Sequence, residues 1–193
     1  MMTHDWGRFY SFTKDSPPWP LLMRAASLAP VSRRALDLGA GAGRDTRYLL
    51  EQGFQVTAVD SDPRSVAMLR ALPQANLLVV QSSFEEFTFA SYDLISSQFA
   101  LPFTPAEHFP EVFARVEAAL APGGIFAGQL FGIHDQWNVP GTTMTFLTRA
   151  GAEALLTDLE TLEFTEEDAD GHIADGSPKH WHAFHILARK PSR

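Results

Sequence analysis

The stretch LDLGAGAGRD (36–45) constrains the fold more than any other part of the chain, because it joins three kinds of local structure. A short apolar run ends at Gly39, two more glycines follow, and a helical pattern covers 43–53. Glycine lets the backbone turn tightly and approach a ligand, and the free N–H groups of a helix start face an anion or carboxylate. The stretch therefore predicts a buried strand, a ligand-binding turn and a helix. The alternative is a tight strand–helix turn that binds no ligand.

Strand and helix patterns alternate along most of the chain. Strands are predicted over 33–39, 54–60, 75–81, 92–97, 124–132, 160–168 and 180–190. Helices are predicted over 16–29, 43–53, 62–72, 104–124 and 148–159, the first with Ser16 as its cap. Such alternation is typical of an α/β domain, a parallel sheet with helices on both faces. The last two strands have no helix between them, so they are expected to pair antiparallel or to lie across a hairpin-like loop.

The spacing of the glycines and of one acidic residue indicates a nucleotide. A dinucleotide fingerprint, G-x-G-x-x-G, needs its third glycine where this chain has Arg44. Asp60 ends the second predicted strand, where a carboxylate can accept hydrogen bonds from ribose hydroxyls. Because that acid is common to both nucleotide classes, an NAD(P)-dependent oxidoreductase stays an alternative, although Arg44 speaks against it.

Composition excludes several classes of function. The formal charge of −8 opposes a broad nucleic-acid footprint, which would need a basic face. The absence of cysteine removes disulfides, thiolate metal sites and iron–sulfur clusters. No apolar run approaches the roughly 20 residues of a membrane span, and MMTHDWGRFYSF lacks the pattern of a signal peptide. We expect a cytoplasmic protein with a small-molecule partner, no nucleic acid and no membrane; the oligomeric state is unknown at this level.

Four stretches together carry a family resemblance. They are LDLGAGAGRDTRYLLEQGFQVTAVDSDP (36–63), VVQSSFEEF (79–87), YDLISSQFALPF (92–103) and ALAPGGIFAGQLF (119–131). These stretches resemble the motifs of class I S-adenosylmethionine-dependent methyltransferases. Within that family, the short chain and GAGAGRD are most similar to the small tellurite-resistance-like methyltransferases, which carry an N-terminal helical lid.

The resemblance implies the architecture. It implies a Rossmann-like, seven-stranded, mostly parallel sheet in the order 3-2-1-4-5-7-6, with the last strand antiparallel and helices on both faces. It also implies one methyltransferase domain over 1–193. Within that domain, 1–32 would be a helical cap, 33–132 the cofactor-binding core, and 133–193 the acceptor-side loop, helix and final strands.

The resemblance also implies which residues contact the cofactor. The set for S-adenosylmethionine, or its product S-adenosylhomocysteine, is Gly39, Ala40, Gly41, Arg44, Asp60, Ser61, Ser83, Phe84, Gln98 and Phe99. The turn would pass the methionine portion, Asp60 with Ser61 would hold the ribose, and Phe84 would flank the adenine. Ser83 stands where the family usually has an acidic residue. Arg44 either pairs with the cofactor carboxylate or is a solvated helix residue.

The acceptor is expected at the carboxyl ends of the parallel strands, where open α/β sheets bind ligands. The loop FGIHDQWNVPGTTM (131–144) follows the fifth strand and offers His134 and Trp137. The aromatic segment before the first helix offers Tyr10 as part of a cover over the site. The alternatives are a polar loop anchored by its tryptophan, and N-terminal aromatics that pack on the core. Aromatic walls suit a cationic or a planar acceptor.

The stretch SPKHWHAFHILARK (177–190) places three histidines on the last strand. If that strand runs antiparallel, Lys179, His180 and His182 begin beside the acceptor crevice. Alternation puts His182 and Phe184 on one face and Trp181 and His185 on the other, so the three histidines cannot converge on one metal. A site from His180 and His182 would still need carboxylates such as Asp170 or Asp175, and no metal is expected. His185 is expected to be a core or helix-facing residue.

The function expected from these observations is methyl transfer to a small-molecule nucleophile, which carries oxygen, nitrogen, sulfur or another chalcogen. His182 and His134 are the candidate catalytic residues, because a histidine can act as a base near neutral pH if the acceptor arrives protonated. Tyr10, Trp137, Lys179 and His180 are the candidate acceptor contacts. The alternatives are the oxidoreductase and a non-catalytic module that binds the cofactor or a partner protein.

Overall fold

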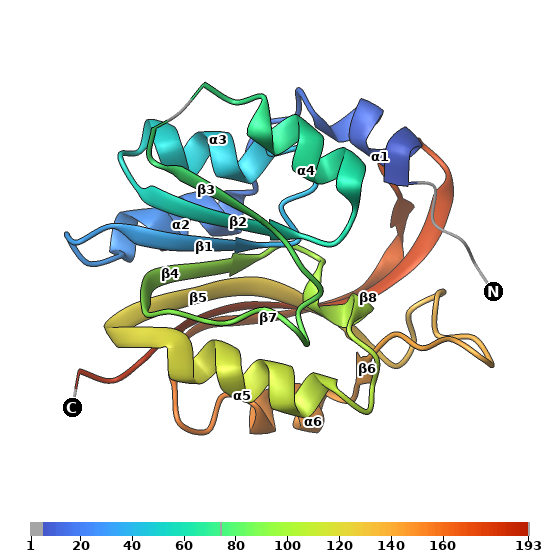
Figure 1. Ribbon diagram of the computed structural model, residues 1–193. Helices are drawn as coiled ribbons and strands as arrows, with labels where there is room; N and C mark the ends of the chain where they lie inside the picture. Colours follow the sequence, from blue (N-terminus) through green and yellow to red (C-terminus); the bar gives the residue numbers. More distant parts are fainter. Residues whose placement is uncertain (1–5, 74, 193) are drawn as a thin grey trace.

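In the computed structural model, which describes residues 6–73 and 75–192, one mixed sheet runs through the whole molecule (Figure 1). Its strands lie in the order β3-β2-β1-β4-β5-β8-β7, and the short β6 pairs with β5 off this path. Strands β1 to β5 are parallel to their neighbours, whereas β8 is antiparallel to both β5 and β7. The strands are β1 Arg34–Leu38, β2 Gln55–Asp60, β3 Leu77–Gln81, β4 Tyr92–Ser97, β5 Leu120–Gly132, β6 Phe146–Leu147, β7 Glu160–His172 and β8 Pro178–Arg189.

The predicted order of the sheet is confirmed, as is the antiparallel direction of the last strand. The labels differ only because the two-residue β6 lies between β5 and the final pair. β6 belongs to the acceptor-side loop and was not predicted, since FL alone carries no periodic signal.

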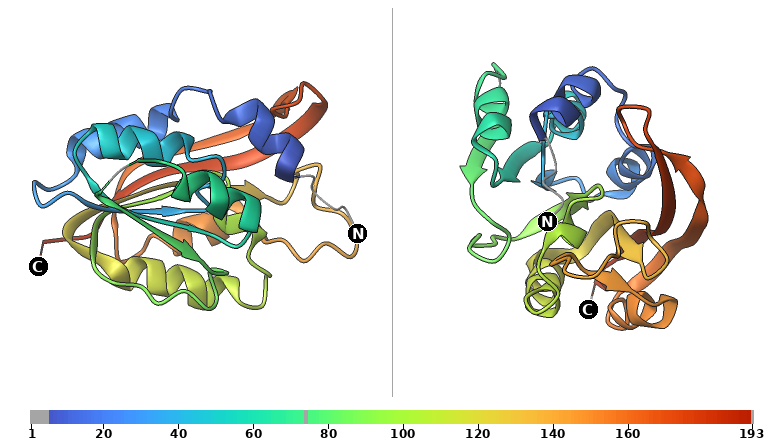
Figure 2. Two further views of the ribbon diagram at one scale, coloured as in Figure 1. Left: turned by 45° about the horizontal axis from the view of Figure 1, so that its top comes forward. Right: turned by 90° about the vertical axis from the view of Figure 1, so that its right-hand side faces the viewer.

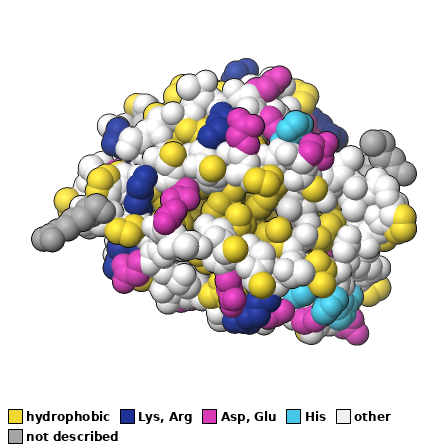
Figure 3. Space-filling view, turned by 90° about the horizontal axis from the view of Figure 1, so that it is seen from below, with side chains coloured by type: hydrophobic (Ala, Val, Ile, Leu, Met, Phe, Trp, Pro, Cys, Tyr) yellow, Lys and Arg dark blue, Asp and Glu magenta, His cyan; other side chains and the backbone are white. Residues whose placement is uncertain are grey.

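Helices cover both faces of the sheet, as predicted. They are α1 Trp6–Thr13, α2 Pro20–Leu28, α3 Arg44–Glu51, α4 Pro63–Arg70, α5 Phe109–Ala119 and α6 Arg149–Ala154. Figure 1 shows α1 to α4 above the sheet and α5 and α6 below it. Successive residues of β5 pack on opposite faces of the sheet. Ile125 belongs to the hydrophobic cluster under α2, whereas Phe126 belongs to the cluster under α5. Seen from below, apolar side chains gather in the middle of the face and charged ones surround them (Figure 3).

Several element boundaries differ from the prediction, and two helix starts among them have a clear reason in the residues there. Ser16 does not cap the first predicted helix, because α2 begins at Pro20 after Trp19; the Trp19 N–H donates to Asp45 instead. The helix predicted over 104–124 begins only at Phe109, because Pro110 is tolerated in the first turn of a helix and not in its interior. It ends at Ala119, and β5 takes in the Pro-Gly-Gly stretch with a shift of register against β4.

The hairpin of β7 and β8 is longer than predicted and reaches past the rest of the sheet. β8 pairs with β5 only over 183–189, whereas 178–182 pair with β7 alone. Figures 1 and 2 show this outer part curving toward α1. Arg8 of α1 forms an ion pair with Asp175 in the hairpin turn, at 3.5 Å. The first helix and the last hairpin therefore meet above the carboxyl edge of the sheet.

The proposed cap over 1–32 has two different parts in the structure. α1 lies over the carboxyl edge, whereas Leu22 of α2 is fully buried against the sheet. The first five residues of that range lie outside the described part of the chain. Within 6–73 and 75–192, none of the helices has the length and apolar character to cross a bilayer.

Candidate functional site

A cavity of about 1250 Å³ opens at the carboxyl ends of β1, β2, β4 and β5. Its roof comes from α1 and from the turn of the β7–β8 hairpin, 171–175. The parallel strands deliver their following loops to this one edge, which is why residues distant in the sequence line the same space. One half of the cavity is lined by the glycine turn and the other half by aromatic rings.

The glycine turn adopts the conformation that the sequence demands. Gly39, Gly41 and Gly43 all have positive φ, which side chains with a Cβ rarely adopt. A Cβ on Gly39 would lie 2.2 Å from the Cβ of Ala100, so β1 and the loop after β4 could not approach as they do. The hydroxyl of Ser65 in α4 donates to the Gly41 carbonyl at 2.6 Å. The turn is thus held open toward the cavity by packing on its other side.

Asp60 ends β2 against this turn. One carboxylate oxygen accepts from the Gly41 N–H at 2.8 Å, and the other accepts from the Asp62 N–H at 2.9 Å. Each oxygen keeps a further lone pair, and both Asp60 and the adjacent Ser61 line the cavity. The predicted ribose position therefore lies beside the predicted turn.

Tyr10 lies in the glycine-turn half of the cavity and not in the aromatic half, where it was expected as an acceptor contact. Its ring is the nearest group to Gly41, and its hydroxyl donates to the Asp62 carboxylate. Burial, followed by the charge of Asp60, raises the pKa of Tyr10 above its ordinary value, so the phenol stays protonated. Tyr10 therefore lies over the glycine turn and lines the cavity there.

Arg44 lines the cavity, and its Nε donor makes no hydrogen bond within the described residues. Its guanidinium lies 4.7 Å from the centroid of Trp19, and its Nε is 3.6 Å from a carboxylate oxygen of Asp45. That distance is too long for a hydrogen bond, and Nε is buried without a partner within the described residues. A buried donor of this kind is costly unless a ligand accepts from it, so the donor fits a carboxylate group in the cavity. Of the two roles considered for Arg44, the structure favours the carboxylate contact.

The loop after β4 completes the nucleotide half. Gln98, Phe99 and Phe84 line the cavity, as the resemblance implied, whereas Ser83 does not: its hydroxyl accepts from the Glu86 N–H within a local turn. Phe99 has a φ of 56°, a strained value for an aromatic residue. Its N–H donates to the side chain of Gln129 at 3.1 Å, which helps to hold that conformation.

A wall of aromatic rings forms the other half of the cavity. The rings are Trp6, Phe99, Phe103, Phe131, Trp137 and Trp181. Trp137 and Trp181 lie with centroids 5.9 Å apart, and Phe131 contacts both, at 5.7 and 6.2 Å. The wall joins the loop after β5 to the hairpin, so its shape depends on how these two segments are fixed together.

Lys179 fixes the loop after β5 and the β7–β8 hairpin together from behind the aromatic wall. It was expected as an acceptor contact, but its side chain is buried and does not line the cavity. Its Nζ donates to Asp135 at 2.5 Å and lies 3.6 Å from the centroid of Trp181. Asp135 also accepts from the Trp137 and His182 N–H groups. Burial lowers the pKa of Lys179, and the hydrogen bond and charge of Asp135 oppose that shift.

His185 on β8 lines the cavity, as does His172 near the hairpin turn, although His185 was expected to be a core or helix-facing residue. Its Nε2 lies 3.0 Å from the carboxylate of Glu167 on β7, and its ring meets Phe99 edge-on at 6.0 Å. With Nε2–H donating to Glu167, Nδ1 is the acceptor, and no protein group of the described chain bonds to it. Strand alternation correctly placed His185 on the same face of β8 as Trp181. It could not predict which of the two faces of β8 borders the cavity.

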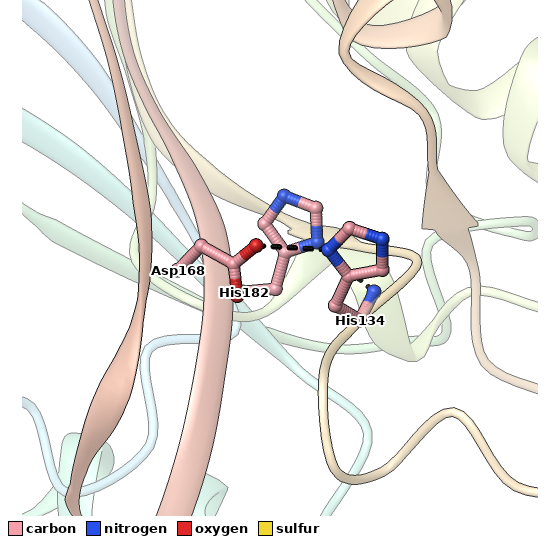
Figure 4. A group of neighbouring side chains, drawn as sticks. All are labelled: His134, Asp168 and His182. Carbon is pink, nitrogen blue, oxygen red and sulfur yellow. Dashed lines mark hydrogen bonds and ion pairs between the residues drawn. The ribbon is translucent and has the colours of Figure 1, made fainter.

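The candidate catalytic residues His134 and His182 lie outside the cavity, on the other face of β8 (Figure 4). Their rings stack at 4.7 Å. His182 is 2 % exposed; its Nδ1 accepts from the His134 N–H, and its Nε2 lies 2.9 Å from Glu166. Since both nitrogens are engaged and the ring does not reach the cavity, the geometry speaks against either histidine as the base for the acceptor.

His180 lies on the same outer face and also misses the cavity, contrary to its predicted contact with the acceptor. Its two ring nitrogens lie 2.7 and 2.8 Å from Asp170 and Asp168, and His134 approaches Asp168 at 2.8 Å. Asp170, followed by Asp168, raises the pKa of His180. Hydrogen bonds from His134 and His180 lower the pKa of Asp168. These groups link the loop after β5 to the hairpin.

The same outer face brings together donor atoms of His134, Asp168 and His182, all within 4.8 Å of one another (Figure 4). A metal there would need a ring nitrogen of His182, and both already take part in hydrogen bonds within the protein. The distances among the histidines and carboxylates are those of hydrogen bonds. We therefore interpret the group as a hydrogen-bonded link and not as a metal centre.

Behind the glycine turn, Asp37 of β1 is buried and accepts from the hydroxyl of Thr46 in α3 at 2.6 Å. Burial, followed by the charge of Asp45, raises the pKa of Asp37 to about 7. This acid does not line the cavity; it joins the strand before the turn to the helix after it.

Comparison with known proteins relates the central part of the chain to a methyltransferase family. Residues 35–124 match the family described as methyltransferase domain. Over 116 residues the chain is 37 % identical to an uncharacterized methyltransferase of Mycobacterium tuberculosis (strain H37Rv), an alignment that covers 59 % of this chain and 46 % of the relative. It is 28 % identical over 95 residues to the probable S-adenosyl-L-methionine-dependent methyltransferase TehB of Haemophilus influenzae, covering 47 % of this chain and 33 % of TehB.

Solved structures of methyltransferases share the fold of this chain. TehB from Haemophilus influenzae matches with a TM-score of 0.74 and 23 % identity, over 88 % of this chain and 61 % of TehB. The Burkholderia thailandensis 1,6-didemethyltoxoflavin-N1-methyltransferase, solved with 1,6-didemethyltoxoflavin and S-adenosylhomocysteine, matches with a TM-score of 0.65 and 22 % identity, over 96 % and 82 % of the two chains. The chain spans less than half the length of the curated relatives named above. The match over residues 35–124 favours a methyltransferase over the dinucleotide oxidoreductase.

Proposed function

We propose that the protein transfers the methyl group of S-adenosylmethionine to a small-molecule nucleophile bound in the aromatic half of the cavity. One observation carries this proposal: the glycine turn with Asp60 and the aromatic wall line a single continuous cavity of about 1250 Å³. A cofactor held by the first half would therefore meet an acceptor held by the second without any larger rearrangement.

The nucleotide half offers a group for each part of the cofactor. The cofactor carboxylate would accept from the buried Nε of Arg44, which has no partner within the described protein. The ribose hydroxyls would donate to Asp60, and Phe84 would lie against the adenine, with Tyr10 above the turn. The Nε of Arg44 and the carboxylate of Asp60 can both still form hydrogen bonds with a ligand, which supports this placement of the cofactor.

The aromatic half would position the acceptor and handle its proton. The sulfonium supplies an activated methyl group, which the acceptor's lone pair takes as the carbon–sulfur bond breaks and S-adenosylhomocysteine leaves. The protein's task is to align the two reactants and to exclude water. His185 is the side chain placed to accept a proton from an acceptor hydroxyl, thiol or N–H, and Glu167 orients its ring and stabilises the imidazolium.

A small acceptor is favoured by the size of the cavity, about 1250 Å³, and by the charge of −8, which opposes nucleic acid. Among the solved neighbours, the enzyme from Burkholderia thailandensis methylates a small heterocycle. The acceptor atom of this protein stays open among oxygen, nitrogen, sulfur and other chalcogens.

Calorimetric titration with S-adenosylmethionine, S-adenosylhomocysteine and NAD tests the cofactor. We expect both sulfur compounds to bind and NAD not to bind, and we expect Asp60→Ala and Arg44→Met to weaken the binding of S-adenosylhomocysteine by about tenfold or more each. Arg70→Met, at the far end of α4, is the matched control and should bind like the wild type. Binding of NAD alone would contradict the proposal. A screen of small phenols, thiols, amines and chalcogen oxyanions for S-adenosylhomocysteine release then tests the transfer.

A further inference from the structure

The aromatic wall of the cavity encloses a cation that belongs to the protein. The Nζ of Lys179 lies 3.6 Å from the centroid of Trp181, 4.4 Å from that of Trp137 and 5.1 Å from that of Phe131. All three rings line the cavity, whereas Lys179 is 3 % exposed and does not. The ammonium therefore lies behind the rings, on the side away from the ligand space.

Asp135 keeps that cation in place. Its carboxylate is 2.5 Å from Nζ, and the pair is almost completely removed from water. The same carboxylate accepts from the N–H groups of Trp137 and His182, so it is bonded to the loop and to β8 at once. A buried pair with this many hydrogen bonds specifies one arrangement, because any other arrangement leaves a charge unpaired.

We propose that Lys179 occupies the cation-binding faces of Trp137 and Trp181 from inside the protein, so that the cavity takes a neutral, flat aromatic acceptor in preference to a cationic one. This inference rests on the proposed function only in treating the aromatic half as the acceptor site. It deepens that function by naming the class of molecule that the site selects.

The physical reason is the quadrupole of the indole ring. The face of an indole attracts a cation because electron density lies above and below the ring plane. An ammonium on one face draws that density toward itself, and its charge repels a second cation on the opposite face. Stacking of a neutral ring depends on dispersion and on burial of apolar area, which the ammonium leaves intact.

Asp60 and Asp45 line the cavity on the side of the glycine turn, and the three other carboxylates that line it each have a partner within the protein. Glu167 pairs with His185, Asp175 with Arg8, and Asp62 with Arg64. A cationic acceptor would therefore find the indole faces occupied, and it would find Asp175 and Asp62 already paired with arginines. A neutral ring of matching width would find a wall of rings on which to stack.

The test compares two fused bicyclic probes, neutral 2-naphthol and cationic N-methylquinolinium, titrated into protein saturated with S-adenosylhomocysteine. Tryptophan fluorescence and calorimetry report binding to the wall without requiring turnover. We expect 2-naphthol to bind at least about tenfold more tightly, which is the scale of one cation–π contact forgone. Equal binding, or tighter binding of the cation, would overturn the proposal.

A second arm changes the cation itself. The double variant Lys179→Met/Asp135→Asn removes both charges together, so that no buried carboxylate is left alone. We expect the preference for 2-naphthol to fall to within about threefold, because the indole faces become free for N-methylquinolinium. Lys179→Arg, which retains the cation, and Lys190→Met, at the other end of β8, should keep the wild-type preference. An unchanged preference in the double variant would contradict the proposal.

The two proposals fail in distinguishable ways. If S-adenosylhomocysteine does not bind the wild type, the proposed function fails, and the two probes still report on the wall in its absence. If S-adenosylhomocysteine binds and the probes show no preference, only the acceptor class fails. Should the double variant not fold, as judged by circular dichroism, the wild-type comparison of the two probes decides alone.

Discussion

The two faces of β8 carry similar residues in opposite roles. On the face toward the cavity, Trp181 and His185 line the ligand space and Lys179 supports it from behind. On the outer face, His180 and His182 have both ring nitrogens engaged with protein groups. Histidines that are close in the sequence are therefore divided between a ligand wall and a structural link. The difference teaches that the availability of a ring nitrogen, and not the density of histidines, distinguishes the face that borders the cavity.

The largest expected effect concerns the support behind the wall. Lys179→Met leaves the Asp135 carboxylate buried without its cation, and we expect the free energy of unfolding to fall by about 3–5 kcal/mol. Urea denaturation followed by circular dichroism measures this. The exposed Lys14 provides the control, since Lys14→Met should change the free energy of unfolding by less than about 0.5 kcal/mol. A loss below about 1 kcal/mol in Lys179→Met would show that the pair does not anchor the wall.

The next effect separates the two histidine faces by catalysis. With a protonated acceptor from the screen, His185→Ala should lower kcat by about 100-fold, because the base that takes the proton is lost. His182→Ala, the matched change on the outer face, should leave kcat within about threefold and bind S-adenosylhomocysteine normally. A larger loss in His182→Ala would reverse the comparison.

A smaller effect tests the close packing of the outer face. A Cβ on Gly132 would lie 2.2 Å from Nδ1 of His182, so Gly132→Ala should destabilise the fold by about 1–3 kcal/mol. The double variant Gly132→Ala/His182→Ala removes the clashing ring and should recover part of that loss, which a double-mutant cycle measures. Gly151→Ala in α6 is the control, since a Cβ there meets nothing closer than 3.3 Å. If the losses of stability in the two single variants simply add in the double variant, the ring of His182 is not the group that requires a glycine at position 132.

The smallest effect is the pH dependence of the outer link. The lowered pKa of Asp168 contributes stability that is present above its ordinary value of 3.8 and is lost as the pH falls through its folded-state pKa. The raised pKa of His180 contributes stability that is present below 6.5 and is lost as the pH rises through its folded-state pKa. Both contributions are therefore present between pH 3.8 and 6.5.

Unfolding of the wild type and of Asp168→Asn, measured in urea across that range, tests the link. The difference between the two proteins should be greatest inside the window and should shrink on either side of it. A difference that does not vary with pH would show that the exposed pairs add nothing to stability, as many surface ion pairs do not.

The nucleotide half could be predicted from the sequence because its determinants are local. The turn at Gly39 and Gly41 follows directly on β1, and Asp60 ends the next strand, so short-range patterns place all three. Arg44 could be named as a candidate residue, but its role could not be assigned from the sequence. That role depends on how Trp19, the residue before α2, packs against the Arg44 guanidinium.

The acceptor half could not be predicted in the same way. Asp135 and Lys179 are 44 residues apart and meet only through the register of β8 against β5 and the path of the loop between β5 and β6. Alternation correctly divided His182 from His185, but the choice of face depends on which side of the sheet α1 and the hairpin turn enclose. The position of Tyr10 over the glycine turn also depends on how α1 docks, and no local pattern encodes that.

The outer part of the hairpin is a two-stranded ribbon, since residues 178–182 pair with β7 and not with β5. Hairpin turns accept insertions and deletions more readily than the strands of a central sheet. A change in the length of this ribbon would alter the depth of the ligand space while the pairing of 183–189 with β5 stayed intact. The segment that borders the cavity is thus separate from the segment that holds the sheet together, so under the proposed function the ribbon is the natural place to redesign the specificity for the acceptor.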